Sequence, residues 1–357
     1  MTASDNFSRI ASAPVVEPEP NMVTKIVSQL ETPAPLFWEE AGQAAPTMDE
    51  HDRLAAKLPA LASIEVNRIP DDRTITRETL LVAAWNAERL KYREASAERI
   101  QATGADIVLL SEADIGMARS GNRHTVADLA RDLGMSYAYG VEFVEMGLGD
   151  SREREWHRNE ANAVGFHGNA ILTRLPMLDV TLIRLDDGGV WWSDAMDGQG
   201  RFGYRMAIAA RLQTEAGSLA AVAAHLESKS DATDRARQTA RLLEAVDRFA
   251  GDLPVVIGGD FNTNALPEQC RDPLGFEPLF NVLAEHGYDW ERANDFALTQ
   301  RTRPDGTPTP PFARLDWLFT RNIGASNPRT IAAIDETNAA ISDHELVIAD
   351  ISPRDRP

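Results

Sequence analysis

The chain has 357 residues, 43% of them hydrophobic, so it can bury a substantial core as one large domain or two ordinary ones. Its formal net charge of -19 disfavours tight, non-specific binding to a nucleic-acid backbone, because such binding needs lysine and arginine to displace counterions. Cys270 is the single cysteine, which excludes an intrachain disulfide and a cysteine-based zinc site. Any metal must therefore be held by oxygen and nitrogen ligands.

The N-terminal part of the chain differs in composition from the rest. Residues 1–40 combine proline with acidic and small residues, which predicts a flexible arm with at most a short helix around Met22 to Leu30. Residues 41–77 are expected to form an extension that packs on the domain, and residues 78–357 the catalytic domain. The first residues lack the basic and apolar regions of a signal peptide, and no run of about eighteen apolar residues occurs. We therefore expect a cytoplasmic protein without a membrane span.

From Glu78 onward, apolar strand-like runs alternate with amphipathic helical stretches, the pattern of an α/β or α+β domain. Strands are predicted at residues 80–86, 106–110, 169–172, 205–212, 219–225 and 255–257. Helices are predicted at residues 92–103, where Gly104 is a suitable stop, and at 233–250. Loops are predicted at the polar segment 147–168, which resembles an insertion over one face, at 188–203 and at 302–311.

Polar side chains end many of these apolar runs, where packing has no need of them. They are Asn86, Glu112, His225, Asp260 with Asn262, Asp316, and Asp343 with His344. A rigid strand fixes a side chain at its end while the loop beyond admits a ligand. We therefore expect these residues to gather at one edge of a sheet.

Such a cluster suits a hard divalent cation. Mg²⁺, or similarly Mn²⁺, is held by one or two carboxylates together with substrate phosphate, so Glu112 and Asp343 suffice, with Asn86 as a helper.

Transfer of a phosphoryl group then needs an activated water and fixed donors to the developing charge. Asp260 can act as the base for water and Asn262 can orient it. His225 and His344 can donate to phosphate, and Asp316 can hold the ring of His344.

Each of these residues also has an ordinary structural interpretation. Asp260 and Asn262 can be turn residues, Asn86 and Glu112 can be helix caps, and the histidines can be satisfied core or surface residues. Their joint occurrence in this order favours the functional interpretation.

The segments together resemble the endonuclease/exonuclease/phosphatase superfamily of metal-dependent phosphoesterases. The matching pieces are Trp85-Asn86, Ser111-Glu112, Gly168 to Arg174, Ala224-His225-Leu226, Gly259 to Asn262, Leu315 to Phe319 and Ser342-Asp343-His344. The resemblance implies a four-layer α/β/β/α sandwich, in which two packed mixed sheets are flanked by helices and the site lies at one end. It also implies that Glu112 binds metal with help from Asn86, that Asp260 activates water, and that Asp316 orients His344.

The residues that follow Glu112 offer candidates for substrate binding. Arg119 with Arg123 can clamp a second phosphate, although both can equally pair with some of the many acids. We also assign Asn122, His124 and Asn169 to substrate binding. The aromatic residues Trp191, Trp192, Phe202 and Tyr204 can form a wall for a base, sugar or headgroup, or can simply anchor a loop.

The sequence thus predicts a metal-dependent hydrolase of a small or medium phosphodiester or phosphomonoester. One alternative is a nuclease with a local groove built by Arg152, Arg154, Arg158 and Arg201. The other is a catalytically inactive binding module on the same fold.

Overall fold

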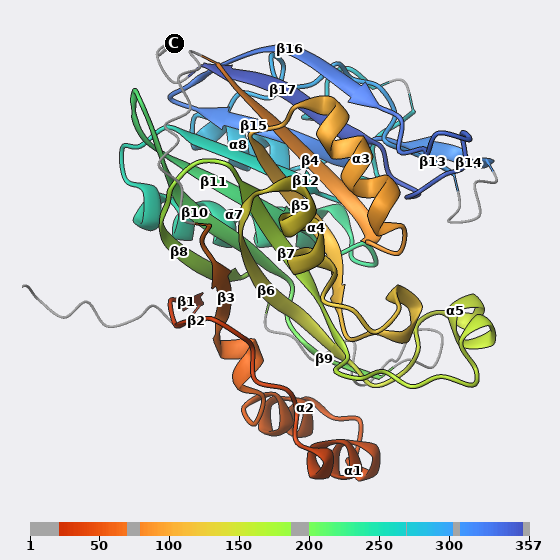
Figure 1. The fold of residues 1–357 in the computed structure, drawn as a ribbon. Helices are drawn as coiled ribbons and strands as arrows, with labels where there is room; N and C mark the ends of the chain where they lie inside the picture. The colour runs from red at the N-terminus through yellow and green to blue at the C-terminus, as the bar shows by residue number, and fades with distance from the viewer. Residues whose placement is uncertain (1–20, 70–78, 187–199, 269, 303–307, 353–357) are drawn as a thin grey trace, which may run out of the picture.

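The computed structural model describes residues 21–69, 79–186, 200–268, 270–302 and 308–352 (Figure 1). Two large mixed sheets pack face to face. The first, sheet A, has the order β1 (Met22–Val23), β8 (Met177–Arg184), β10 (Met206–Thr214), β11 (Gly217–His225), β12 (Val255–Asp260) and β15 (Asp316–Arg321).

The second sheet, sheet B, has the order β16 (Gly324–Ile331), β17 (Leu346–Ser352), β4 (Leu80–Arg89), β5 (Ile107–Ile115), β7 (Phe166–Thr173), β6 (Ser136–Glu145), β3 (Ile64–Asn67) and β2 (Ile26–Val27). A short strand, β9 (Arg201–Gly203), pairs with β6 beside this path. A separate hairpin joins β13 (Gln300–Thr302) and β14 (Pro308–Ala313).

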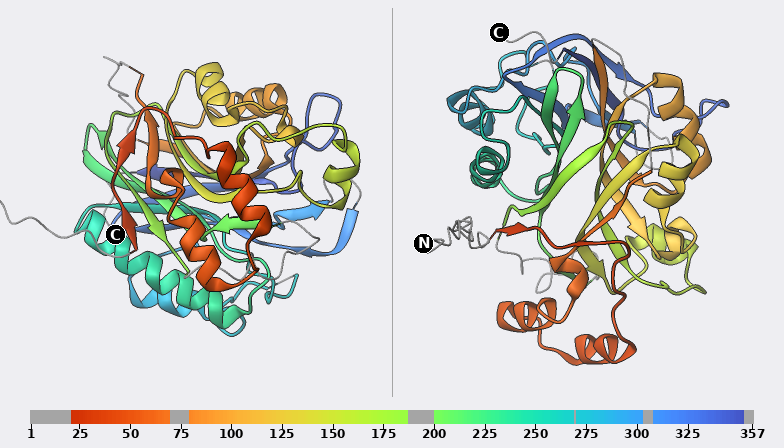
Figure 2. Two further views of the ribbon diagram at one scale, coloured as in Figure 1. Left: turned by 90° about the horizontal axis from the view of Figure 1, so that it is seen from below. Right: turned by 60° about the vertical axis from the view of Figure 1, so that its left-hand side comes forward.

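Helices cover the outer faces of both sheets. One buried apolar cluster joins sheet B to α3 (Arg93–Thr103) and α4 (Thr125–Leu133), and another joins sheet A to α7 (Ala232–Ala250) and α8 (Leu279–Glu285). A third cluster fills the space between the sheets. The four-layer α/β/β/α sandwich is therefore confirmed, and Figure 2 shows the two sheets with helices on either side.

The helices and strands expected from Glu78 onward are present, with longer bounds for several strands. β4 is apolar along most of its length because it is covered on both faces. The α3 helix ends at Gly104, whose φ of 73° is the left-handed conformation that stops a helix, and α7 begins at Asp231, whose side chain accepts from the backbone N–H of Asp234.

The face between the sheets turns polar at one end. Along β4, Val82 and Ala84 lie in the inter-sheet cluster, and Asn86 follows two residues later. Because side chains alternate along a strand, Asn86 continues the face of those residues. The same spacing relates Ala223 to His225, Gly258 to Asp260 and Leu318 to Asp316. The dry interior of the sandwich therefore ends in a polar cluster.

The sheets approach closely just below this cluster, at Gly258. A Cβ atom at Gly258 would lie 2.9 Å from Cβ of Ala84 and 2.7 Å from Cδ2 of Leu318. Close packing of this kind leaves no room for a side chain, so Gly258 sets the distance between β12 and β4 where the site begins.

The N-terminal region is more regular than expected. The helix predicted around Met22 to Leu30 is wrong, because β1 pairs with β8 and β2 pairs with β3 instead. The β-branched residues of these two short segments suit a strand, and pairing with the sheets decides the outcome. The predicted flexible arm, residues 1–40, extends too far along the chain, because α1 (Pro35–Gln43) begins within it. Residues 1–20 lie outside the described residues.

The α1 and α2 (Met48–Ala55) helices lie together at one end of the sandwich (Figures 1 and 2). His51 on α2 is buried, and its Nε2 accepts a hydrogen bond of 3.1 Å from the backbone N–H of Gly203 on β9. Phe37 on α1 contacts Phe202 edge to face. These contacts fix the two helices to the edge of sheet B.

The loop predictions need correction at their ends. Residues 201–203 of the predicted 188–203 loop form β9, and Pro308 to Pro311 of the predicted 302–311 loop belong to β14. In the 147–168 segment, α5 (Ser151–Trp156) forms and β7 begins at Phe166. β9 forms by pairing with β6, which is distant in the sequence, whereas β14 forms by hairpin pairing with β13.

Candidate active site

The strand ends that carry the polar residues meet at one edge of each sheet, as expected. In sheet A, His225 pairs with Asp260 across parallel strands, and Asp260 pairs with Asp316 across antiparallel strands. Asp316 begins β15, and His344 precedes β17, so these two residues lie at strand starts rather than strand ends. Antiparallel pairing brings these starts to the same edge as the ends of the parallel strands.

Asp260 is the centre of the cluster. Its Oδ1 accepts from the backbone N–H of Asn262 at 2.8 Å, and its Oδ2 accepts from the Asn86 amide at 3.1 Å. The Nε2 atoms of His225 and His344 each lie 3.8 Å from Oδ2. Asp260 thus lies between two imidazole rings at the end of the closed interior.

Each imidazole is also hydrogen-bonded to a second carboxylate through its other ring nitrogen. Nδ1 of His344 donates to Oδ2 of Asp316 at 2.7 Å, and Nδ1 of His225 donates to Oε2 of Glu142 at 3.2 Å. Burial opposes protonation, but attraction from Asp316 and Asp260 raises the pKa of His344 well above its ordinary value. Attraction from Glu142 likewise overcomes burial and raises the pKa of His225. Each carboxylate thus favours the charged form of the imidazole that it contacts.

Asp260 has the opposite environment. Burial raises the pKa of Asp260, and repulsion from Asp316 adds to the rise, against attraction from the two histidines. A carboxylate with a raised pKa is a stronger base than one on the surface. Asn262 adopts a left-handed backbone, with φ of 49°, and its Nδ2 donates to the carbonyl of Leu226 at 2.9 Å. Asp260 and Asn262 therefore form a local turn, and this turn is compatible with a functional role for both residues.

Sequence reasoning missed the residues around His225. Arg205 is buried and forms ion pairs with Glu142 at 2.7 Å and Glu227 at 2.8 Å, while its NH1 atom lies 3.1 Å from Nδ1 of His225. Burial opposes ionisation of Glu142, but attraction from Arg205 and then His225 lowers the pKa of Glu142 to about 2. In the sequence, the sign of a functional role for Glu142 is its position inside the apolar run Tyr137 to Val144. That run was not predicted to be a strand, and in the structure it belongs to β6.

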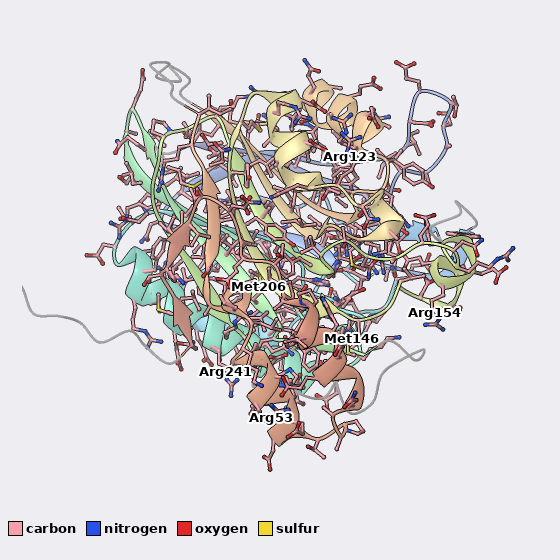
Figure 3. The ribbon with its side chains drawn as sticks, turned by 60° about the horizontal axis from the view of Figure 1, so that its bottom comes forward. Arg53, Arg123, Met146, Arg154, Met206 and Arg241 are labelled. Carbon is pink, nitrogen blue, oxygen red and sulfur yellow. The ribbon has the colours of Figure 1, made fainter. Side chains whose placement is uncertain are left out.

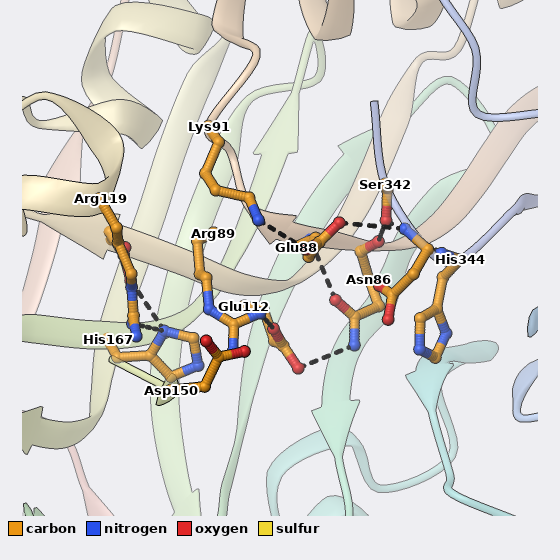
Figure 4. A network of polar contacts seen from close by, with 12 residues as sticks. Asn86, Glu88, Arg89, Lys91, Glu112, Arg119, Asp150, His167, Ser342 and His344 are labelled. Carbon is orange, nitrogen blue, oxygen red and sulfur yellow. Dashed lines mark hydrogen bonds and ion pairs between the residues drawn. The ribbon is translucent and has the colours of Figure 1, made fainter. Parts of the chain in front are cut away.

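Glu112 lies on the sheet B side of the cluster (Figure 4). Its Oε1 accepts from the Asn86 amide at 3.1 Å, and its Oε2 pairs with Arg89 at 3.0 Å. Burial opposes ionisation, but attraction from Arg89, then His167 and His225, lowers the pKa of Glu112 well below its ordinary value. Glu112 is therefore a fully charged carboxylate held by two neighbours.

The Ser342-Asp343-His344 segment closes the site against β4. The hydroxyl of Ser342 donates to the carbonyl of Asn86 at 2.7 Å, and the backbone N–H of Asp343 donates to Glu88. Burial, with repulsion from Glu112, raises the pKa of Asp343 against attraction from His344. Burial, with repulsion from Asp343, raises the pKa of Glu88 to about 7. Acidic side chains are thus crowded around Asp343, and each opposes the ionisation of its neighbour.

Ligand atoms of Asp260, Asp316 and His344 lie within 4.8 Å of one another, so these three residues also form a group that could hold a metal ion. In this structure, Nδ1 of His344 and Oδ2 of Asp316 are hydrogen-bonded to each other. The hydrogen bond to Asp316 orients the His344 ring, and the two carboxylates together with Nε2 of His344 remain a candidate ligand group.

The substrate-binding assignment of Arg119 was wrong. Its side chain is 1% exposed and pairs with Asp114 at 2.8 Å and Glu145 at 2.9 Å. The carboxylates surrounding the guanidinium occupy its donors and shield it from the surface, so it cannot clamp a substrate phosphate.

Two other proposed substrate contacts also serve the fold. Asn122 donates to the carbonyl of Ala161 and accepts from the backbone N–H of Ala163. His124 accepts from the backbone N–H of Ala127 at the start of α4, and its Nε2 lies 2.6 Å from Glu65. We therefore assign neither residue to substrate binding.

Asn169 is different, because it is buried at the same end of the inter-sheet space. Its Nδ2 donates to the carbonyl of Met206 at 3.1 Å, whereas its Oδ1 has no hydrogen-bond partner among the described residues. A buried polar atom without a partner marks a position for a ligand or water. Asn169 therefore stays a candidate for substrate binding.

The aromatic wall is not supported where the structure describes it. Phe202 is fully buried against Phe37, and Tyr204 contacts His51, so both anchor α1 and α2. Trp191 and Trp192 lie outside the described residues. Within the described part of the chain, no helix is long and apolar enough to cross a membrane.

Comparison with known proteins agrees with this geometry. The chain is a two-sheet sandwich whose strand ends carry carboxylate, amide and imidazole groups. A sequence profile of the Endonuclease/Exonuclease/phosphatase family matches residues 83–344, so the chain belongs to this family. Its members are generally phosphoesterase hydrolases that depend on divalent metal.

Several solved structures share the fold at low sequence identity. The endonuclease/exonuclease/phosphatase from Beutenbergia cavernae is 20% identical with a TM-score of 0.55, covering 77% of this chain and 72% of that one. The human Nocturnin catalytic domain with bound sulfate is 19% identical with a TM-score of 0.51, covering 81% and 96%. The family member from Bacteroides vulgatus is 18% identical with a TM-score of 0.51, covering 76% and 98%. No curated protein sequence matches the chain.

Proposed function

We propose that this protein hydrolyses a small or medium phosphate ester by metal-assisted attack of a water activated by Asp260. The observation that carries the proposal is the position of Asp260, within 3.8 Å of two imidazoles that are each backed by a carboxylate. One base and two charged donors are the groups that hydrolysis at phosphorus needs from a protein.

The residues of the sheet B side fit a divalent cation, Mg²⁺ or Mn²⁺. Glu112 is ionised, Asp343 lies close enough to repel it, and the Asn86 amide lies beside Glu112. Hard cations of this kind favour such oxygen ligands. The acids at this end outnumber the lysines and arginines. The acids are Glu88, Glu112, Asp114, Glu142, Glu145, Glu153, Glu227, Asp260, Asp316 and Asp343, and the cations are Arg89, Lys91, Arg119, Arg201 and Arg205.

When bound there, a divalent cation supplies Lewis-acid neutralisation of the charge on the phosphoryl oxygens. The protein side chains do the rest. His225 and His344 donate to the phosphoryl oxygens, and Asp260 takes a proton from the attacking water, which Asn262 orients. Asp316 keeps His344 in its donating orientation, as Glu142 does for His225.

The preference for a small substrate rests on charge. The net charge is -19, and the arginines in and just after α5 have local partners. Arg152 pairs with Asp150, Arg158 pairs with Glu155, and Arg154 donates to the carbonyl of Gly149. Figure 3 shows Arg154 at the edge of the molecule. Arg201 stacks on Phe143. Arg152 and Arg158, which pair with acids, therefore offer little uncompensated charge to a polynucleotide, and a nuclease is the second candidate.

A panel of generic phosphomonoesters, phosphodiesters, phospholipids and nucleic acids, assayed with Mg²⁺ and with Mn²⁺, tests the proposal. The wild type should hydrolyse at least one small ester, and His344→Ala should not. Vigorous plasmid nicking that Asp260→Ala abolishes would favour the nuclease. Failure on every substrate would favour an inactive binding module.

A further inference from the structure

The end of β4, after Asn86, has an unusual backbone. Glu88, Arg89 and the following Leu90 all have positive φ, at 41°, 70° and 52°, and the pairing of β4 with β5 shifts register between Asn86 and Arg89. Non-glycine residues rarely adopt this conformation, and three in succession persist only where the surroundings determine them. This irregular strand end places Arg89 against Glu112.

Arg89 is shared between two carboxylates. Its NH1 atom lies 3.0 Å from Oε2 of Glu112, and its Nε lies 3.1 Å from Oε1 of Glu153. The side chain of Glu153 is 4% exposed, so little solvent screens its attraction for Arg89. Figure 4 shows Arg89 on the side of Glu112 opposite Asn86.

Glu153 belongs to α5, in the polar segment that interrupts the regular sandwich. Its Oε2 accepts from the backbone N–H of Asp150 at 2.9 Å, which completes a capping box at the start of the helix. The same oxygen lies 3.3 Å from NH1 of Arg119, which Asp114 and Glu145 also hold. One buried side chain therefore links the helix cap to the arginine that contacts Glu112.

We infer that Glu153 is a positioning residue for Glu112, the carboxylate proposed to bind the metal, and that it acts through Arg89. While Glu153 is charged, the guanidinium is balanced between two acids and fixes Glu112 from one side, as Asn86 does from the other. Without that charge, Arg89 pairs with Glu112 alone and opposes a cation there. Groups behind a metal ligand commonly change metal affinity by about 10 to 100-fold.

This inference rests on the proposed metal function, and binding of Mn²⁺ to the metal-free protein, followed by electron paramagnetic resonance, tests it without relying on turnover. Glu153→Gln should weaken Mn²⁺ binding by about tenfold. Glu145→Gln, a matched control that removes another buried acid paired with Arg119, should change it less than twofold. Thermal unfolding checks that each variant is folded.

A double variant decides whether the effect passes through Arg89. If it does, Glu153→Gln should change Mn²⁺ affinity little when Arg89→Gln is already present. Equal weakening in both backgrounds, or equal weakening by Glu145→Gln, would show a long-range charge effect and overturn the inference. Should Arg89→Gln not fold, the comparison of Glu153→Gln with Glu145→Gln decides alone. If the wild type binds no Mn²⁺, the proposed function fails instead.

Discussion

The two sheets build their halves of the site in different ways. Sheet A brings His225, Asp260 and Asp316 into line by unbroken strand pairing. Sheet B places Glu112 at a register shift, with a positive φ of 54°, and holds it with Arg89. Regular pairing fixes the groups that we propose to exchange protons, whereas an irregular backbone and ion pairs fix the carboxylate that we propose to bind a cation. The two halves should therefore fail differently when altered.

The largest effect is expected from the sheet A half. Asp260→Asn removes the base, and general-base catalysis typically contributes about 10² to 10⁴-fold to rate. Turnover should fall by that factor while Mn²⁺ affinity stays within about threefold of wild type, as measured by titration on the same samples. A matching loss of metal binding would break the proposed division between the sheets.

Glu112→Gln tests the sheet B half. Replacing the ionised ligand should weaken Mn²⁺ binding by at least about 10 to 100-fold. Rate should recover in part as metal is raised, because Asp260 and both histidines are intact. If saturating metal restores nothing although binding is complete, Glu112 takes part in the chemistry itself.

Glu142→Gln tests a contact between the two halves, because Glu142 of sheet B is hydrogen-bonded to His225 of sheet A. Loss of the charge lowers the raised pKa of His225, so the alkaline limb of the kcat/KM profile should move to lower pH, with about a hundredfold loss at alkaline pH. A pH series of initial rates measures this shift. If the alkaline limb does not move, a group other than His225 controls the loss of activity at high pH.

The same variant makes a prediction for stability with a defined sign. The folded pKa of His225 lies above the unfolded value, so the pair stabilises the protein fully below the ordinary histidine pKa and less as the pH rises through the folded value. The difference in Tm between wild type and Glu142→Gln should therefore shrink with rising pH.

Gly258→Ala tests the contact between the sheets. The added methyl group meets Cβ of Ala84, which cannot move without its strand, and overpacking of this kind costs about 1 to 3 kcal/mol. Urea unfolding measures the change. Full stability in this variant would mean that the sheets can separate below the site.

The smallest effect is expected at Asn122. Asn122→Ala removes hydrogen bonds to residues 161–163, which lie on the surface, and should leave kcat/KM within about twofold of wild type. A large rise in KM alone would restore this residue to substrate binding.

The sequence predicted the sheet A half well, because polar residues two positions after apolar ones reveal both the strand and the face. It predicted the sandwich and the positions of Glu112 and His344 through their motifs. It could not predict that Arg119 is buried, because an arginine in a loop looks the same in sequence whether it faces solvent or three acids. It also missed Glu142, Arg205 and Glu153, whose partners lie far along the chain.

The central claim is that metal and base are separate parts of one hydrolytic site. Hydrolysis of bis(p-nitrophenyl) phosphate, measured against Mn²⁺ concentration for the wild type, Glu112→Gln and Asp260→Asn, tests it most directly. The account predicts metal-dependent turnover in the wild type, a higher metal requirement in Glu112→Gln, and normal metal binding without turnover in Asp260→Asn. Turnover that survives removal of metal, or wild-type activity in Asp260→Asn, would contradict it.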